Sequence, residues 1–201
     1  MRPRALNNAI DAAAAASIVR RTLEANVALH ERVKAGGAES VVRAAEAIRS
    51  ALASGRKVLA FGNGGSAADA QHLTTELVGR FQKERAGFPA IALTADTSLL
   101  TSLANDYGFE QIFARQVEAL GEPGDVAVAI STSGLSPNIV AALTKARTLG
   151  VQTVAITGRD GGEAGRLAEI HINVPDDCTA RVQEVHITLI HAICEIVELG
   201  D

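Results

Sequence analysis

Three titratable residues, Asp69, His72 and Glu76, follow a glycine-rich stretch at positions that a helix would place on one face. The segment reads FGNGGSAADAQHLTTE over residues 61–76. Spacings of three and seven residues keep the three side chains within about 60° of one another around a helix axis. An imidazole and a carboxylate four residues apart, such as His72 and Glu76, can ligate one zinc ion. A solvated polar face is the alternative, but the glycines directly before this helix favour chemistry.

The glycine-rich stretch itself, GNGGS over residues 62–66, has two interpretations. It can be a tight turn between a strand and a helix, with Ser66 as the N-cap. It can also be a ligand loop, because glycines allow close backbone approach and a helix N-terminus offers unpaired N–H groups to an anion. Gly62, Gly64 and Ala67 loosely match a dinucleotide-binding pattern. The sequence leaves both interpretations open.

A second polar cluster, STSGLSP over residues 131–137, follows an apolar run. Pro137 is typical of the first position of a helix and Ser136 of the N-cap, so one hydroxyl has a structural explanation. The other three hydroxyls have no structural explanation and belong to Ser131, Thr132 and Ser133. Hydroxyls around a helix N-terminus can hold a phosphate, and the absence of a P-loop lysine favours a sugar phosphate over a nucleoside triphosphate.

The segment RVQEVHITLIH, residues 181–191, contains Gln183 and His191 eight residues apart. On a regular helix this spacing corresponds to a rise of about 12 Å, which would stretch both side chains if they were to reach one metal ion. Spacing alone therefore favours structural roles for the histidines here. Asn105 and Asp106, in NDYG, are typical of a turn.

These residues need elements to position them, and the chain supplies a strand–helix alternation. Helical patterns fill residues 1–55, with one helix over 38–54. Short apolar runs typical of strands buried on both faces follow at 57–61, 89–93, 125–130, 151–157 and 169–174. Helices of about ten to fifteen residues are expected from near Ser66, Leu99, Pro137 and Glu163, and a last helix over 179–199. The alternation predicts an α/β, doubly wound, flavodoxin-like parallel sheet of five strands.

We expect one domain over residues 1–201, made of a helical N-terminal extension (1–55) and an α/β core (56–201). Ligands of such sheets bind outside the carboxyl ends of the strands, where both polar clusters fall.

Composition narrows the classes of function. The net charge is −4 and only six residues are aromatic, which gives little support to nucleic-acid binding. No apolar run is long enough to span a bilayer, and the alanine-rich N-terminus, interrupted by Asp11, is better interpreted as an amphipathic helix than as a signal peptide. Cys178 and Cys194 are expected to be reduced. These features indicate a cytoplasmic protein.

Six blocks, taken together and in order, resemble the sugar-isomerase (SIS) domain family, most closely its phosphoheptose isomerases. The blocks are GNGGSAADAQH, PAIALTADTS, NDYGFEQIFARQVEALG, GDVAVAISTSG, TGRDGGE and RVQEVHITLIH. The resemblance implies an enzyme that converts sedoheptulose 7-phosphate to D-glycero-D-manno-heptose 7-phosphate, the first step of activated heptose biosynthesis and so of lipopolysaccharide. It further implies a homotetramer with active sites at subunit interfaces and one zinc ion per subunit.

The resemblance also implies roles for individual residues. Glu76 would be the base and His191 the acid of an enediolate mechanism. The zinc ligands would be His72, Glu76, Gln183 and His191. The substrate would contact Asn63, Gly64, Gly65, Glu76, Asn105, Asp106, Ser131, Thr132, Ser133, Ser136 and Gln183. Leu135 stands where many isomerases have a polar residue.

Two rival functions remain open from the sequence. One is a non-catalytic SIS-domain regulator of the type that associates with the replication initiator, although such members lose the acidic and histidine residues that are present here. The other is a nicotinamide-dependent dehydrogenase, for which Asp96 stands near the end of the second strand, where a ribose-binding carboxylate would be expected.

Overall fold

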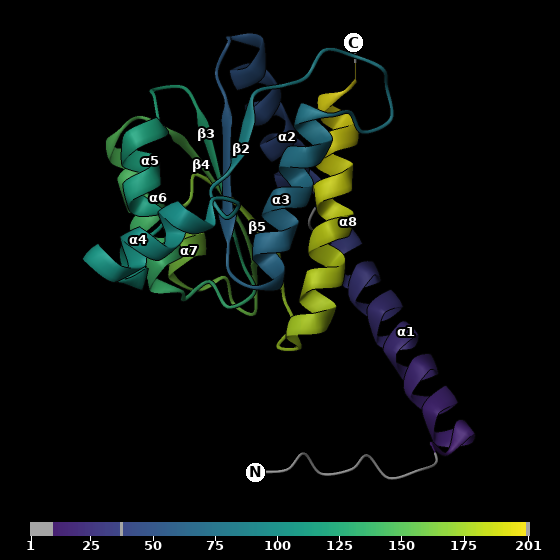
Figure 1. Ribbon diagram of the computed structural model, residues 1–201. Coiled ribbons are helices and arrows are strands. Elements are labelled where there is room, and N and C mark those ends of the chain that lie inside the picture. Colours follow the sequence, from purple (N-terminus) through teal and green to yellow (C-terminus); the bar gives the residue numbers. More distant parts are fainter. Residues whose placement is uncertain (1–9, 37, 200–201) are drawn as a thin grey trace.

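The computed structural model describes residues 10–36 and 38–199, and its centre is a five-stranded sheet (Figure 1). The strands are β1 (Val58–Gly62), β2 (Ala90–Ala92), β3 (Val126–Ser131), β4 (Gln152–Gly158) and β5 (Ile170–Val174). Every pairing is parallel, in the order β2-β1-β3-β4-β5. The flavodoxin-like sheet predicted from the sequence is confirmed, with each strand within one or two residues of its expected position.

Eight α-helices and a short 3₁₀ helix surround the sheet in the described part of the chain. They are α1 (Ala12–Lys34), α2 (Ala38–Ala53), α3 (Gly65–Val78), α4 (Thr97–Tyr107), η1 (Phe109–Gln111), α5 (Ala114–Leu120), α6 (Pro137–Thr148), α7 (Gly162–Leu167) and α8 (Thr179–Val197). Helices α2, α3 and α8 cover one face of the sheet, and α4 to α7 lie on the other (Figure 1).

Alternate residues of the central strands supply two separate cores. In β1, Val58 and Ala60 pack beneath α2, α3 and α8, whereas Leu59 and Phe61 pack beneath the opposite helices. All five residues of this strand are buried. A strand covered on both faces gives the continuous apolar run seen in the sequence, because neither face has to be polar.

The structure corrects three expectations about helices. Helix α7 has only 6 residues, fewer than expected. The connection between β2 and β3 contains η1 and α5 in addition to α4, and neither was expected. Helix α3 begins at Gly65 with Gly64 as its N-cap, so Ser66 is a buried residue of the first turn and not the cap.

Helix α1 begins at an aspartate cap and extends away from the rest of the molecule (Figure 1). Its C-terminal part packs on α8 through Leu29 and Val33. Its N-terminal part carries exposed apolar side chains. No described helix is long and apolar enough to cross a membrane. The alanine run over residues 12–16 forms the first turns of α1, so the helix expected there is confirmed, and residues 1–9 lie outside the described part of the chain.

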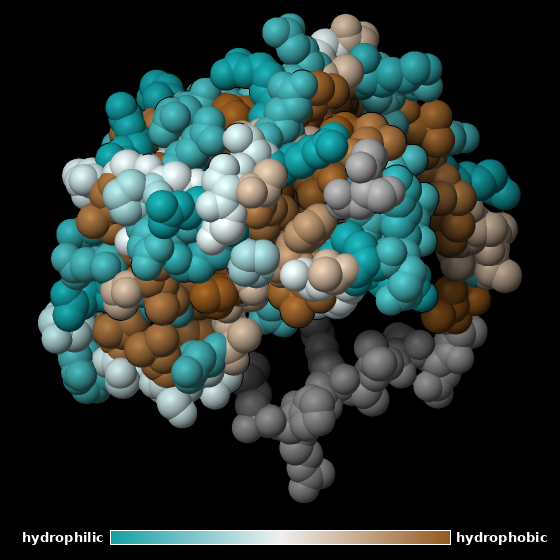
Figure 2. All heavy atoms as spheres, turned by 90° about the horizontal axis from the view of Figure 1, so that it is seen from above, coloured by the Kyte–Doolittle hydropathy of each residue, from teal (hydrophilic) through white to brown (hydrophobic). Residues whose placement is uncertain are grey.

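Hydrophobic and hydrophilic residues alternate in patches over the upper face of the molecule (Figure 2). Two cavities lie beside the N-terminal helices. One, of about 460 Å³, is lined by residues of α1, α2 and β5, and another, of about 380 Å³, by residues of α1, α2 and α8. Neither includes the polar clusters identified in the sequence.

Candidate active site

The loops that follow β1 and β3 meet at the carboxyl edge of the sheet. These two strands are neighbours in the sheet, although β2 lies between them in the chain. The helices that follow them, α3 and α6, pack on opposite faces of the sheet, so the two loops start side by side and then separate. This point, where the strand order reverses, is where doubly wound sheets bind their ligands. The two loops contain the glycine-rich stretch 62–66 and the hydroxyl-rich stretch 131–137.

A reciprocal amide pair joins the two loops. Asn63 Nδ2 donates to Asn138 Oδ1 and Asn138 Nδ2 donates to Asn63 Oδ1, both at 2.9 Å. Asn138 is 1% exposed, in the first turn of α6. The pair fixes the spacing of the loops. The sequence analysis did not identify Asn138, and its place two residues after Ser136 gave no signal of a contact with residue 63.

The hydroxyls of the 131–137 loop differ from expectation in one respect. Ser136 is the N-cap residue of α6, but its side chain makes no capping hydrogen bond. Ser131 Oγ accepts from Gly134 N at 3.1 Å, and Ser133 Oγ accepts from Leu135 N at 3.2 Å. Two hydroxyls therefore shape the loop as acceptors and keep their own protons available for donation.

The loop depends on a glycine at position 134. Gly134 has φ +65°, and a Cβ there would lie 2.0 Å from the carbonyl oxygen of Gly161, in the loop after β4. The backbone N–H of Ala164 donates to the Gly134 carbonyl at 2.9 Å. The hydroxyl-rich loop thus rests directly on its neighbour across the sheet edge.

Helix α8 approaches the N-terminus of α3 through Gln183. A Cβ on Gly65 would lie 2.3 Å from Gln183 Nε2, so the Gln183 amide occupies the space that the missing side chain leaves open. Gln183 is thereby placed beside Gly64 and Gly65 at the carboxyl edge. The two helices run in the same direction from this point.

Further along the same helices, two imidazoles and a carboxylate meet. His191 Nε2 lies 3.0 Å from His72 Nε2, and the ring centroids are 5.0 Å apart. His72 Nε2 also lies 3.2 Å from Glu76 Oε1. The predicted shared face of His72 and Glu76 is confirmed, and α8 supplies the partner. The Glu76 side chain is 20% exposed and that of His72 42%.

Asp69, one turn before His72, is a half-buried carboxylate with an unused acceptor. Its Oδ2 is buried without a hydrogen-bond partner. Burial raises the pKa of Asp69 to about 6, although His72 acts in the opposite direction. The group is therefore a second carboxylate on the same helix face, two turns before Glu76.

The four proposed zinc ligands are not all together. Tetrahedral zinc with bonds of about 2.0–2.1 Å holds its ligand atoms about 3.3 Å apart, close to the His72–His191 and His72–Glu76 distances. Gln183 lies two turns away, against Gly65. Within residues 10–36 and 38–199, no three His, Cys, Asp or Glu side chains are arranged as a metal site. The donor chemistry of His72, Glu76 and His191 suits zinc, and their side chains would have to reorient around the ion.

Three residues of α4 and its N-cap that the sequence marked as candidate ligand contacts make only local hydrogen bonds among the described residues. Asn105 and Asp106 are exposed at the end of α4, within the helix and not in a turn, and Asn105 Nδ2 donates to Asp106 Oδ1 at 2.8 Å. None of the described hydrogen bonds links them to the loops above. Asp96 is the N-cap of α4 and accepts from Leu99 N, which explains this aspartate without a ribose. Both cysteines are free thiols, as expected.

Fold and site together define an α/β domain with glycine-rich and hydroxyl-rich loops at the carboxyl edge of its sheet and with a carboxylate and two imidazoles on the adjacent helices. A family model described as "SIS domain" matches residues 23–158. The chain therefore belongs to the SIS domain family, and its relatives place it among the phosphoheptose isomerases.

Three of these relatives illustrate the similarity. A phosphoheptose isomerase of Aquifex aeolicus is 60% identical over 161 residues, which cover 80% of this chain and 84% of that protein. The structure of phosphoheptose isomerase from Neisseria gonorrhoeae has a TM-score of 0.86 and 42% identity, over 90% of this chain and 97% of the other. One from Francisella tularensis has a TM-score of 0.88 and 38% identity, over 91% and 97%. The family predicted from the six sequence blocks is confirmed.

Proposed function

We propose that this chain is an aldose–ketose isomerase that converts sedoheptulose 7-phosphate to D-glycero-D-manno-heptose 7-phosphate. The observation that carries the proposal is the meeting of Glu76, His72 and His191 one helix segment away from the phosphate-type loops. The identity to relatives named phosphoheptose isomerase gives the substrate class. A silent regulator would not need this carboxylate–imidazole group, and Asp96 is used as a helix cap and not as a ribose ligand.

The reaction moves hydrogen between C1 and C2 and needs a base on carbon and an acid on oxygen. In this proposal the Glu76 carboxylate takes the proton from one carbon and returns it to its neighbour after an enediolate has formed. His191 supplies a proton to the carbonyl oxygen and accepts one from the hydroxyl oxygen that becomes the new carbonyl. His72 lies within reach of both and holds their relative positions.

The phosphate would bind at the carboxyl edge of the sheet. Donors there are the N–H groups at the start of α3, at Gly64 and Gly65, and the hydroxyls of Ser131, Thr132, Ser133 and Ser136. Asn63, Asn105, Asp106 and Gln183 complete the proposed substrate contacts. Seven residues of helix separate Gly65 from His72, a distance of roughly 10 Å along the axis. A substrate with its phosphate and its carbonyl at opposite ends of a long chain suits this separation.

We further propose one zinc ion per subunit, held by His72, Glu76 and His191. Gln183, the fourth ligand implied by the resemblance, lies two turns away against Gly65 and would have to move to reach the same ion. Zinc would act as a Lewis acid that polarises the substrate carbonyl. A bound ion would also tie α3 to α8, so chelation should lower the thermal midpoint and added zinc should restore it. Metal analysis of protein purified without chelator would accompany the melts. Identical melting of stripped and loaded protein, or purification without zinc, would contradict this part.

A homotetramer in the cytoplasm is the assembly we propose, with each active site at a subunit interface and the domain made of residues 1–201. Exposed apolar residues on α1 support association, and sites open to solvent on one subunit can be closed by another. The product would enter the synthesis of nucleotide-activated heptose for lipopolysaccharide.

The decisive experiment follows turnover and hydrogen exchange together. Glu76→Gln should abolish isomerisation of sedoheptulose 7-phosphate and also deuterium uptake from solvent at C1 or C2, both observed by NMR. His191→Asn should largely abolish isomerisation while slow carbon exchange continues, because the base remains. Zinc content must be measured on each variant. Near-normal turnover by Glu76→Gln would show that Glu76 is not the base and would make Asp69 the candidate.

A further inference from the structure

The C-terminal end of α8 contains a buried carboxylate that no step of the proposed reaction uses. Glu198 is 2% exposed and directly follows the last residue of α8. It accepts hydrogen bonds from the backbone N–H groups of Phe81 at 2.8 Å, Gln82 at 2.9 Å and Lys83 at 3.0 Å. Burial by itself raises the pKa of Glu198, but these hydrogen bonds and the charge of Arg85 lower it to about 2. Glu198 is therefore a fixed anion around which a loop is folded.

That loop, residues 79–89, connects α3 to β2 and passes around the end of α8 (Figure 1). Arg85 Nε donates to Glu198 Oε1 at 3.0 Å, and the two side chains are only 6% and 2% exposed. A buried ion pair of this kind is costly unless all of its hydrogen bonds are made. The two terminal nitrogens of Arg85 make the remaining hydrogen bonds, all to backbone carbonyl oxygens.

Arg85 joins this loop to the last turn of α3. Its Nη2 donates to the carbonyl oxygen of Glu76 at 2.8 Å and its Nη1 to that of Leu77 at 2.9 Å. These carbonyls belong to the last turn of a helix, where no intrahelical partner exists. The guanidinium therefore caps α3 at the residue that we assign as the base.

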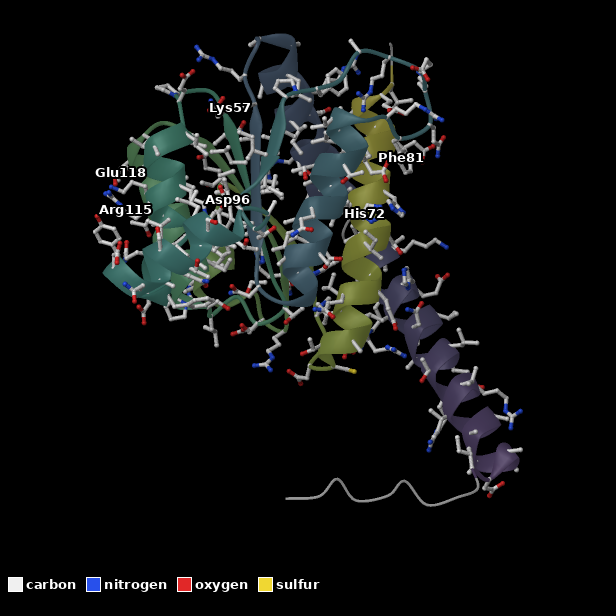
Figure 3. The ribbon with its side chains drawn as sticks, viewed as in Figure 1. Lys57, His72, Phe81, Asp96, Arg115 and Glu118 are labelled. Atoms are coloured by element: carbon white, nitrogen blue, oxygen red, sulfur yellow. The ribbon has the colours of Figure 1, made fainter. Side chains whose placement is uncertain are left out.

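Phe81, at the other end of the same network, contacts the proposed acid. Its ring centroid lies 5.4 Å from that of His191, with the planes tilted by 31°. Figure 3 shows Phe81 and His72 one above the other along α8, and both rings contact His191. One cluster thus reaches the backbone of Glu76 and the imidazole of His191.

We propose that Glu198 is a positioning residue of the isomerase. It acts through Arg85 and Phe81 to hold the Glu76 carboxylate and the His191 imidazole at fixed positions relative to each other. The inference rests on the proposed function, because it takes Glu76 and His191 as the reacting groups. Proton transfer to and from carbon requires both groups at fixed distances from the substrate, and small misplacements are costly to the rate. The phosphate loops lie at the opposite end of α3, so disturbance of this cluster should change kcat far more than KM.

A second buried carboxylate provides a matched control. Asp125, 0% exposed, accepts from the backbone N–H groups of Lys57 and Glu122 and pairs with Lys57 Nζ at 2.7 Å. It lies at the start of β3, and Lys57 lies well away from His72 (Figure 3). Asp125→Asn should lower stability without affecting catalysis.

The test compares kcat, KM and thermal midpoint in Glu198→Gln and Asp125→Asn, in the full chain with zinc content measured. Glu198→Gln should lower kcat by about tenfold or more at nearly constant KM. Asp125→Asn should lower the thermal midpoint with kcat unchanged. Phe81→Leu, which leaves the Glu198 ion pair intact, should lower kcat and keeps the proposal testable if Glu198→Gln does not fold. An unchanged kcat in either Glu198→Gln or Phe81→Leu would overturn the proposal.

A readout independent of turnover separates this inference from the proposed function. The imidazole ¹⁵N resonances of His191 should shift in Glu198→Gln and Phe81→Leu but not in Asp125→Asn. If the wild-type chain does not isomerise the heptose phosphate, the proposed function fails, and these shifts still decide whether the cluster holds His191. Unmoved His191 resonances in both variants would refute the positioning role.

Discussion

At the scale of single residues, the hydroxyl-rich loop separates structural from ligand-binding groups. Ser131 and Ser133 already accept hydrogen bonds from backbone N–H groups of their own loop, so removing them would disturb the loop as well as the phosphate site. Thr132 is half-buried, and no hydrogen bond of its hydroxyl accompanies those of its neighbours. Thr132 is therefore the position at which the contribution of a hydroxyl to substrate binding can be measured alone.

Replacing Thr132 by valine should raise the substrate KM by about tenfold or more with little change in kcat or thermal midpoint. Valine has nearly the same shape, so the loop is preserved, while one donor to the phosphate is lost; such a bond to a charged group contributes about 1.5–3 kcal/mol. Steady-state kinetics and a thermal melt would measure both effects. Ser136→Ala, which removes no capping bond, is the matched comparison. A normal KM in both variants would place the phosphate elsewhere.

Which residues could be found from the sequence depended on how local their partners are. Asp69, His72 and Glu76 share a face because of the helix repeat alone, and this was predicted correctly. The spacing of Gln183 and His191 predicted that they would not meet at one point, and in the structure they contact different turns of α3, at Gly65 and at His72. The contact of His191 with His72 could not be predicted, because it joins two helices. Contacts such as Asn63 with Asn138, or Phe81 with Glu198, join positions 75 and 117 residues apart. No local pattern encodes them.

At the scale of elements, the strands were predictable and the short helices were not. A strand covered on both faces leaves an apolar run, and all five were identified. Helix α5 has 7 residues, too few to be stable alone, and it forms because Val117 and its neighbours Ile112 and Phe113 are buried against the sheet and α6. The sequence of that region therefore resembled a connection.

The buried carboxylate that holds the 79–89 loop against α8 should make the free energy of unfolding depend on pH in the acid range. The pKa of Glu198 lies at about 2, below the ordinary carboxyl value of 4.5. The ionised group therefore stabilises the fold above about pH 4.5, and this contribution is lost as the pH falls towards about 2. The free energy of unfolding of Glu198→Gln should fall below that of wild type at neutral pH, and the difference should shrink on acidification.

Urea unfolding at several pH values between about 7 and 3 would measure this difference. Glu84→Gln is a suitable control, because its exposed side chain pairs only with Arg80 at the surface, and it should differ little from wild type at any pH. A Glu198→Gln deficit that stayed constant down to pH 3 would be inconsistent with the low pKa.

At the scale of the whole molecule, α1 is the element that the single chain does not explain. Ile18, Val19, Leu23 and Val27 are each more than half exposed, at 56%, 58%, 61% and 62%. Figure 1 shows this half of the helix extending beyond the sheet and its covering helices. Apolar side chains in this arrangement are typical of an interface between subunits.

Leu23→Glu combined with Val27→Glu should reduce the proposed tetramer to smaller species, because two charges would be buried on one helix face. Sedimentation equilibrium would measure the mass, and circular dichroism would verify that the subunit remains folded. Leu120→Glu, at an exposed apolar residue on α5, is the control. A double variant that still sediments as four chains would exclude this part of α1 from the assembly.

The parallel sheet determines how this protein would respond to salt. Helices α3 and α6 follow the neighbouring strands β1 and β3 and begin at the carboxyl edge, so two positive dipole ends, each worth about half an elementary charge, face the proposed phosphate site. These partial charges act only over the first helical turn, and the chain as a whole has a net charge of −4. Such short-range fields do not attract a substrate dianion from a distance, so dissolved salt has no long-range attraction to screen. The association rate should therefore vary little with ionic strength, unlike that of an enzyme which steers its substrate with lysines and arginines.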